Sequence, residues 1–507
     1  MSNLLTEVVR RQAKQRGNAP ALTGGGRTVT YAALDASTNQ IAQALLASGT
    51  GAGSRVGYLT KASVEAAELL VACAKAGLVA VPLNWRLAVP ELVAVAQDAG
   101  LAVILAEPEF LPAAAAVADA LDGIPVIDLA SRAWIVAQPD VDPGFGSDPG
   151  TVLLQIYTSG TTGVPKGVQL TLGNVAYTDE GLTLQGFTQD SVAINVLPMF
   201  HVAGQGWLIC SLIAGGHSIM VPDFQPAEFI SVMESRRVTN ICVVPAMLQV
   251  LTSMPRIEER DFSALEVIVY GASPITPALL RRSMNIFGCD FVQFYGMTET
   301  SGGTTCLTAK DHDPDGPRQH LLRSAGKPLV NVEVRIVATD SGEPLPAGEV
   351  GEVQTRSPHN TPGYWDRPAD NASLLTRDGW LRTGDAGYLD SDGYLFITDR
   401  LKDMVITGGE NVYPVEVEAV LADHPAIAEV AVIGTPDVKW GEAVTAVVVV
   451  KPGAEMPSQR EIIEFTTGKL ASYKKPRVVR FVQALPRNPS GKILKRELRS
   501  SLPSTTN

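Results

Sequence analysis

The sequence predicts an α/β protein with a large N-terminal domain, made of two doubly wound sheets plus a small β-barrel, and a small α+β C-terminal domain. Three observations predict this arrangement. Strand-like and helical runs alternate through the first half of the chain, short β-rich runs separated by turn residues follow, and roughly a hundred mixed residues end it. The 507 residues are also too many for one ordinary domain.

The first sheet is predicted by alternation along the start of the chain. Residues 55–59, 79–82 and 102–106 are strand-like, and the apolar residues 63–76 and 90–100 have helical periodicity. Strands and helices that alternate in this way form a parallel sheet with helices on both faces.

A second sheet is expected after a linker at 138–150, which is rich in Pro, Gly and Asp. Short β-rich runs return there at 152–157, 191–196, 218–221, 240–244 and 267–270. From 323 to 397, β-rich runs separated by Gly, Pro and Asp predict the small barrel. We expect the two domains at 1–400 and 401–507.

Charge and composition exclude several classes of protein. The net charge of −12 disfavours nucleic acid as a partner, and 45% hydrophobic with 19% charged residues is typical of a globular enzyme. No apolar run approaches the roughly 18 residues of a membrane span. The five cysteines are isolated, which predicts neither disulfides nor a zinc site and is typical of a cytoplasmic protein. Residues 4–16 are expected as an ordinary first helix rather than a targeting segment.

One loop predicts phosphate binding directly. Residues 157–167, Tyr-Thr-Ser-Gly-Thr-Thr-Gly-Val-Pro-Lys-Gly, follow a strand and combine hydroxyl groups and glycines with Lys166. Backbone N–H groups and hydroxyls of such a loop can surround phosphate oxygens. Pro165 precedes the lysine and Gly167 follows it, so the loop is not a Walker A motif.

This loop resembles the phosphate-binding motif of the adenylate-forming superfamily, which contains acyl- and aryl-CoA synthetases, luciferases and peptide-synthetase adenylation domains. The resemblance extends from Tyr31 to Arg496, and the other family motifs follow in the family's order. It implies an AMP-forming acid–CoA ligase that uses ATP, Mg²⁺ and coenzyme A. It also implies that the C-terminal domain is mobile about a hinge at Lys402.

The resemblance implies a nucleotide site drawn from several motifs. Glu299 and Thr162 are the expected Mg²⁺ ligands, and Thr298 and Lys492 the expected contacts of the α-phosphate. Read without the resemblance, Thr298 and Glu299 would begin a helix, and Lys492 would be an exposed lysine. The expected ATP and AMP contacts are Thr158, Ser159, Gly160, Thr161, Thr162, Gly163, Lys166, Gly271, Ala272, Ser273, Tyr295, Gly296, Met297, Thr298, Asp385, Ile397, Arg400, Asn411 and Lys492.

The resemblance also implies a site for CoA. Two adjacent glycines without side chains would leave a passage for the pantetheine arm, and scattered basic and aromatic residues would hold its nucleotide. The expected contacts are Arg86, Gly408, Gly409, Trp440, Tyr473, Lys475 and Arg477.

The resemblance also implies an acyl pocket around the motif at 198–204, where His201, one of the expected catalytic residues, would shape or gate the pocket. Similar proteins that adenylate amino acids commonly carry an Asp in this region. None occurs between Pro198 and Trp207, which disfavours an amino acid as substrate. Gln205 stands where some long-chain synthetases carry a gating Trp. The expected pocket residues are His201, Val202, Gly204, Ala272, Gly296, Gly302 and Gly303.

We therefore expect a medium- or long-chain fatty acid as the substrate. The alternatives are an aryl or alicyclic acid–CoA ligase, an enzyme that delivers acyl-AMP to a carrier protein, an oxygenase like the luciferases, and a non-catalytic nucleotide sensor. The expected partners are the carboxylic acid, ATP and CoA, and a homodimer is the assembly considered.

Overall fold

The computed structural model describes residues 3–159, 165–273, 275–407, 410–437, 440–487 and 493–501. The chain falls into two compact units, each described here by itself. Unit 1 comprises Met1–Val334 and Thr355–Leu381, and unit 2 comprises Arg335–Gln354 and Arg382–Asn507. None of the helices in the described part of the chain has both the length and the apolar character that a membrane crossing requires.

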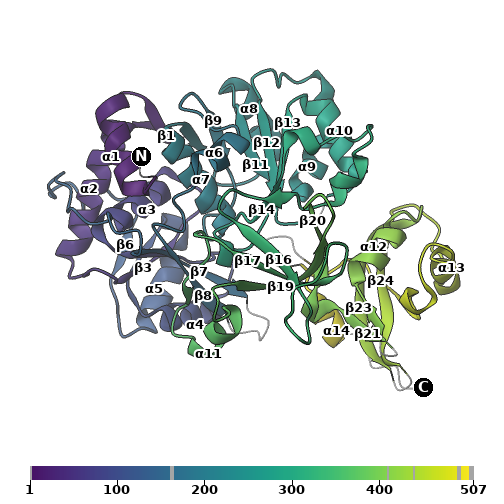
Figure 1. Ribbon diagram of the computed structural model, residues 1–507. Helices are drawn as coiled ribbons and strands as arrows, with labels where there is room; N and C mark the ends of the chain where they lie inside the picture. Colours follow the sequence, from purple (N-terminus) through teal and green to yellow (C-terminus); the bar gives the residue numbers. More distant parts are fainter. Residues whose placement is uncertain are drawn as a thin grey trace. The chain divides into compact units, whose positions relative to one another are not determined.

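Unit 1 contains two large sheets (Figure 1). The seven-stranded sheet has the order β18 (Gly363–Tyr364), β8 (Pro165–Thr171), β7 (Val152–Ser159), β4 (Val79–Pro82), β3 (Arg55–Leu59), β5 (Leu101–Ala106) and β6 (Val126–Asp128). Strands β7, β4, β3, β5 and β6 are parallel, whereas β8 is antiparallel to both of its neighbours. The alternation at the start of the sequence therefore predicted this sheet correctly.

The nine-stranded sheet is parallel in its centre and antiparallel at both edges. Its order is β15 (Lys327–Pro328), β14 (Thr305–Leu307), β13 (Asp290–Tyr295), β12 (Val267–Gly271), β11 (Asn240–Val243), β9 (Val192–Asn195), β10 (His217–Met220), β1 (Pro20–Gly24) and β2 (Arg27–Thr30).

The main core of unit 1 includes residues of both sheets and of the helices α1 (Leu5–Arg16), α2 (Tyr31–Ala47), α3 (Val64–Ala76) and α7 (Val202–Ala214). Helix α3 is buried on nearly every side. It begins at Ser63, whose side chain accepts a hydrogen bond from Ala66 N, and ends at Gly77, which adopts the left-handed conformation with φ of 66°.

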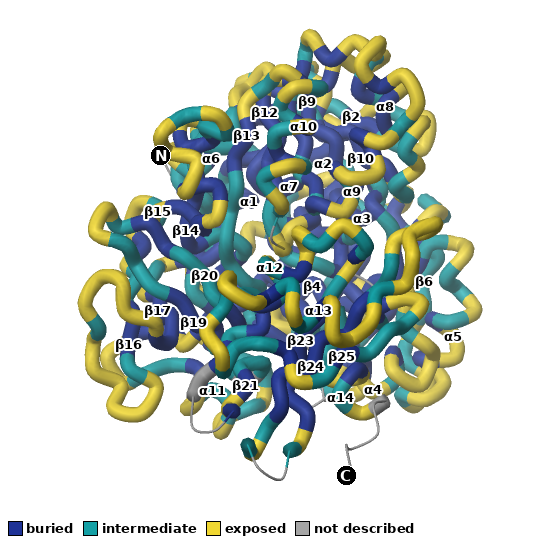
Figure 2. The backbone as a smooth tube through the Cα atoms, turned by 90° about the vertical axis from the view of Figure 1, so that its right-hand side faces the viewer, coloured by how far each residue is buried: buried dark blue, intermediate teal, exposed yellow. Residues whose placement is uncertain are grey.

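Further helices cover the outer faces of the two sheets. The helices α8 (Pro226–Ser235), α9 (Pro245–Thr252) and α10 (Pro277–Phe287) share a second core with the nine-stranded sheet. A third core joins α4 (Val89–Ala99) and α5 (Leu111–Asp119) to the seven-stranded sheet. Two short helices, α6 (Asp179–Leu184) and α11 (Pro368–Leu374), complete the unit. Figure 2 shows the resulting pattern of buried sheets and exposed outer loops.

Unit 2 contains the other two sheets. A four-stranded sheet of β16 (Glu333–Val337), β17 (Gly351–Arg356), β19 (Leu381–Leu389) and β20 (Leu395–Arg400) corresponds to the predicted barrel region. The second sheet is formed by β22 (Glu410–Val412), β21 (Val405–Thr407), β24 (Gly441–Val450), β23 (Ile427–Asp437) and β25 (Val478–Phe481). Its helices are α12 (Pro414–Ala422), α13 (Gln459–Phe465) and α14 (Lys495–Ser501). The expected domain boundary at residue 400 stays a prediction.

Candidate active site

Two antiparallel strands hold the predicted phosphate loop. Thr158 on β7 pairs with Lys166 on β8, and Ser159 pairs with Pro165, so the loop leaves the sheet and returns to it at one point. Lys166 Nζ lies 2.5 Å from Asp370 Oδ1, and the lysine side chain is only 14% exposed. The loop residues Gly160, Thr161, Thr162 and Gly163 lie outside the described residues, as does the side chain of Ser159.

The predicted Mg²⁺ ligand Glu299 lies in a tight turn after β13, within η3 (Thr298–Thr300). Thr300 Oγ1 accepts a hydrogen bond of 3.0 Å from Met297 N and closes the turn. A side chain on Gly296 would collide with the carbonyl group of Gly302, so this position requires glycine. The turn therefore fixes the backbone around the Glu299 side chain, and this residue is buried.

Tyr364 joins this turn to the phosphate loop and was not predicted from the sequence. Its hydroxyl donates a hydrogen bond of 2.9 Å to Glu299 Oε1, and its ring centroid lies 5.2 Å from Lys166 Nζ. Strand β18 places it there, because Tyr364 pairs with Val168 on β8. Burial, followed by the charge of Glu299, raises the pKa of Tyr364, so the phenol remains a donor. Two motifs far apart in the sequence thus share one tyrosine.

The predicted adenine segment begins beside the same turn. Gly271 ends β12 and pairs with Phe294 on the parallel strand β13, so both motifs leave the sheet at its carboxyl edge. Ligands of α/β proteins bind at such edges. Ala272 adopts a left-handed conformation with φ of 64°, and both Ala272 and Ser273 are exposed. The structure therefore brings the Gly271–Ser273 and Tyr295–Thr298 contacts to neighbouring strands.

Two of the predicted acyl-pocket residues face each other. A Cβ atom on Gly302 would lie 3.9 Å from Val202 Cγ2, and His201 directly precedes Val202 at the start of α7. Gly204 has a packing role in addition, because a side chain there would collide with the carbonyl group of Pro198. The pocket motif therefore lies against the turn that follows Glu299.

Neither Gln205 nor Trp207 is placed to act as a movable gate. Gln205 is buried, and its Nε2 donates a hydrogen bond of 2.6 Å to the Tyr58 hydroxyl. Trp207 is also buried, and its Nε1 donates to Ile194 O at 3.0 Å. Both side chains are fixed parts of the core.

His201 is neutral at physiological pH. Burial, and after it the charge of Arg86, lowers the pKa of His201 to about 4. Its Nε2 is buried and finds no hydrogen-bond partner among the described residues. Arg86, which was predicted to bind CoA, lies near the acyl motif, with its guanidinium carbon 5.7 Å from the ring centroid of Phe200. The structure thus brings one predicted CoA residue close to the acyl motif.

In unit 2 the predicted ribose residues face each other across a hairpin. Asp385 on β19 pairs with Arg400 on β20, and Ile397 pairs with Gly387. Asp385 is buried, and its role at the ribose stays a prediction. The side chains of Arg400, Lys402 and Asn411, and the residues Gly408, Gly409 and Lys492, lie outside the described part of the chain.

Two of the predicted CoA residues are in contact in unit 2. The guanidinium carbon of Arg477 lies 4.2 Å from the ring centroid of Trp440, which is the geometry of a cation–π interaction. Tyr473 packs against the core of the unit, and Lys475 Nζ donates a hydrogen bond of 3.2 Å to Thr467 Oγ1. Three of these predicted residues therefore lie on the segment before β25, and the fourth, Trp440, comes from the turn before β24 and contacts one of them.

Known protein families match nearly the whole chain. The family described as AMP-binding enzyme matches residues 9–365, and the family described as AMP-binding enzyme C-terminal domain matches residues 416–492.

Individual relatives are similar over almost their full lengths. Fatty acid–[acyl-carrier-protein] ligase ScoC of Streptomyces coeruleorubidus is 41% identical over 96% of this chain and 94% of its own. Feruloyl-CoA synthase of Amycolatopsis sp is 39% identical over 96% of this chain and 97% of its own. The crystal structure of ATP-bound MatB from Rhodopseudomonas palustris has a TM-score of 0.89 at 31% identity and covers 99% of each chain.

Proposed function

Because the chain belongs to the AMP-binding enzyme family of adenylate-forming acid–CoA ligases, we propose that it joins a neutral, hydrophobic acid to CoA through an acyl-adenylate. The protein is an AMP-forming acyl-CoA synthetase, with ATP and CoA as co-substrates. We further propose which acid and metal ion it uses, which residues act and in what order the steps occur.

The position of Tyr364 supports the proposed roles of Glu299 and Lys166 in binding ATP and its metal ion. Tyr364 lies beside both charged groups of the site, since its hydroxyl donates to the Glu299 carboxylate and its ring lies near the Lys166 ammonium. A hard carboxylate oxygen is a ligand that Mg²⁺ favours, and Mg²⁺ takes its remaining ligands from phosphates and water. A lysine ammonium binds phosphate oxygens. This pairing of groups suits a polyphosphate with its metal ion, and Thr162 is the second proposed metal ligand.

In the proposed first step, a carboxylate oxygen of the acid attacks the α-phosphorus of ATP in line. The bond to the bridging oxygen breaks, and diphosphate leaves with the bonding electrons. Lys492, Thr298 and Lys166 stabilise the charge that develops on the phosphate oxygens. Mg²⁺, when bound at Glu299, supplies neutralising charge for the diphosphate. His201 shapes the acyl pocket as a neutral group.

In the proposed second step, the CoA thiolate attacks the acyl carbon, the acyl–oxygen bond breaks and AMP leaves. Asp385 and Arg400 hold the ribose, and Lys402 is the hinge. The proposed CoA contacts are Arg86, Gly408, Gly409, Trp440, Tyr473, Lys475 and Arg477.

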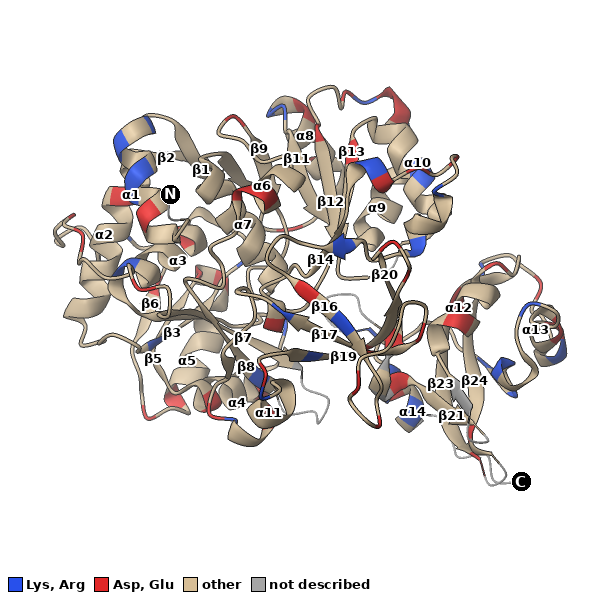
Figure 3. Cartoon of the chain, in the orientation of Figure 1, with Lys and Arg blue, Asp and Glu red and all other residues tan. Residues whose placement is uncertain are grey.

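The proposed acid is a medium- or long-chain fatty acid. Helix α7 carries no charged residue and is entirely tan in Figure 3, and His201 is neutral, so the tail of the acid is uncharged. The similarity to ScoC, which is named for a fatty acid, supports this choice. The similarity to feruloyl-CoA synthase supports an aryl or alicyclic acid as the second candidate.

The proposal is tested by incubating the purified chain with Mg-ATP, CoA and a panel of acids from acetate to octadecanoate, together with ferulate and benzoate. We expect release of AMP and diphosphate that requires CoA and is strongest with a fatty acid. A parallel series with a phosphopantetheinyl carrier protein in place of CoA separates the two acceptors. Absence of diphosphate with every acid contradicts the proposal. Mass measurement in solution tests the proposed homodimer, and fractionation tests the proposed cytoplasmic location.

A further inference from the structure

Helix α7 presents one face to the proposed acyl pocket. Val202, Gly206 and Cys210 are spaced by four residues, so they lie on the same side of the helix. Val202 lies beside Gly302, and a Cβ atom on Gly206 would lie only 2.9 Å from the Tyr177 hydroxyl oxygen. The phenol of Tyr177 therefore stands about one helical turn, roughly 6 Å, beyond the Val202 end of this face.

The Tyr177 side chain is held firmly in this place. Its hydroxyl donates a hydrogen bond of 2.8 Å to Ser301 O, in the turn that follows Glu299. Its ring is stacked on the His359 ring, with 5.9 Å between the centroids. The hydroxyl is deeply buried, and this burial raises the pKa of Tyr177, so the phenol is neutral. The remainder of the residue is only half-buried.

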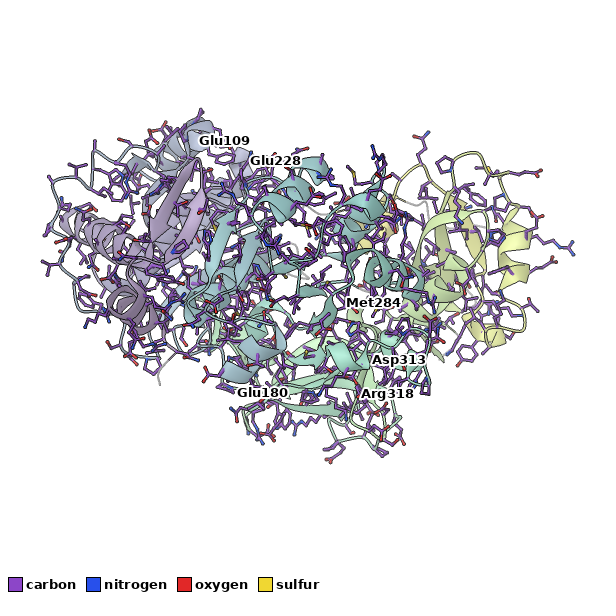
Figure 4. The ribbon with its side chains drawn as sticks, turned by 90° about the horizontal axis from the view of Figure 1, so that it is seen from above. Glu109, Glu180, Glu228, Met284, Asp313 and Arg318 are labelled. Atoms are coloured by element: carbon purple, nitrogen blue, oxygen red, sulfur yellow. The ribbon has the colours of Figure 1, made fainter. Side chains whose placement is uncertain are left out.

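The chain around Tyr177 leads directly into an exposed, charged helix start. Tyr177 directly precedes the N-cap residue of α6, Thr178, and the first turn of α6 carries the exposed Glu180, which Figure 4 labels at the rim of the molecule. The Tyr177 hydroxyl therefore points toward Ser301 and α7, whereas the Glu180 charge is exposed.

We propose that Tyr177 is a specificity-determining residue that closes the far end of the acyl pocket. An acid whose carboxylate end lies between Val202 and Gly302 extends along the α7 face until its tail meets the tyrosine ring. Ser301 O already accepts a hydrogen bond from the Tyr177 hydroxyl. The part of Tyr177 left to contact the acyl tail is therefore its apolar ring. The substrate class is an acid with an uncharged tail whose length the tyrosine limits, so among the fatty acids proposed above this wall favours medium-chain over long-chain tails. This inference rests on the proposed function.

The test compares kcat/KM for hexanoate and dodecanoate, as a ratio, in wild type and variants. Tyr177→Ala removes the ring. We expect the dodecanoate-to-hexanoate ratio of kcat/KM to rise at least about tenfold, because each added methylene contributes binding energy where the pocket has room. Tyr177→Phe keeps the ring and is expected to leave the ratio within about twofold. A merely structural role would lower activity with both acids equally and leave the ratio unchanged.

Two further variants keep the test decisive. Tyr31→Phe is the matched control, because the Tyr31 hydroxyl also donates to a backbone carbonyl, Gly216 O at 2.7 Å, in the core away from the pocket. Gly206→Ala presses on the Tyr177 hydroxyl from the helix side, because the added Cβ atom would lie only 2.9 Å from it. This variant is expected to change the ratio, which tests the same wall should Tyr177→Ala fail to fold. If the wild type is active but neither Tyr177→Ala nor Gly206→Ala changes the ratio, the inference about Tyr177 is overturned while the proposed function stands. A wild type that activates no acid overturns the proposed function.

Discussion

The Tyr364 hydroxyl lies 2.9 Å from Glu299 Oε1, and the same ring lies 5.2 Å from Lys166 Nζ. The hydrogen bond orients the carboxylate, and the ring lies near the lysine cation. Groups that orient a metal ligand from behind commonly control metal affinity almost as strongly as the ligand does. Because Glu299 is the proposed Mg²⁺ ligand, we expect Tyr364 to influence the metal requirement of the reaction through this hydrogen bond.

Tyr364→Phe removes the hydrogen bond to Glu299 and keeps the ring beside Lys166. We expect the Mg²⁺ concentration needed for half-maximal ATP–diphosphate exchange to rise about tenfold, while the rate at saturating Mg²⁺ changes much less. Exchange measured over a range of free Mg²⁺ at constant ATP gives both values. Tyr31→Phe, which removes a buried hydroxyl elsewhere in the core, should leave them unchanged. An unaltered Mg²⁺ requirement in Tyr364→Phe would show that the contact does not orient a metal ligand.

Asp370→Asn tests whether the Asp370 carboxylate competes with ATP phosphate for the Lys166 ammonium group. The Asp370 carboxylate lies 2.5 Å from Lys166 Nζ, so a phosphate oxygen must compete with it for the same ammonium group. We expect the variant to lower KM for ATP by about threefold, in line with the modest strength of partly exposed ion pairs. Asp142→Asn is the control, since it removes a similar carboxylate partner, that of Arg10. A higher KM for ATP in Asp370→Asn would mean that the pair positions Lys166 instead.

The sequence predicted those parts of the site that depend on local pattern. Parallel strands bring their carboxyl ends to one edge, so the neighbouring positions of Gly271 and Tyr295 follow from two strand-like runs before two motifs. Tyr364 could not be predicted in this way. It lies on β18, a strand of two residues that pairs with β8 from a distant part of the chain, and so short a strand has no periodicity to detect.

The proposed acyl pocket illustrates a second limit of local pattern. Val202 and Gly302, which the sequence analysis assigned to it, lie against each other, but their role in binding stays a prediction. The contact of Tyr177 with Ser301 and with Gly206 could not be predicted, because it depends on tertiary packing between α7 and the turn at Ser301. The spacing of Gly206 four residues from Val202 on one helix was the available clue.

Trp440→Ala separates the two half-reactions. Because the Arg477 guanidinium lies 4.2 Å from the Trp440 ring, loss of the ring should disorder the cation that we propose for a CoA phosphate. We expect KM for CoA to rise about tenfold and ATP–diphosphate exchange, which needs no CoA, to stay at the wild-type rate. Arg477→Lys keeps the charge and should give a smaller effect. Equal loss of exchange and thioester formation contradicts a role confined to CoA.

His201 is expected to make the folded protein less stable as the pH decreases. Burial first, and Arg86 second, lowers the pKa of His201 from 6.5 to about 4. Between these two values the unfolded chain binds a proton that the folded protein excludes, so the free energy of unfolding falls as pH decreases through this window. For this residue the loss amounts to at most about 3 kcal/mol, and it is complete below the folded-state pKa.

Replacing the imidazole by an amide, in His201→Gln, should remove this contribution. Urea unfolding at several pH values between the two pKa values should therefore show a flatter dependence in the variant than in wild type. His217 and His312 also have a lowered pKa through burial, but they are present in both proteins and cancel in the difference. If both proteins lost the same free energy on acidification, His201 would bind its proton as readily in the folded as in the unfolded protein. Burial would then not lower its pKa, and the uncharged lining proposed for the acyl pocket would lose its support.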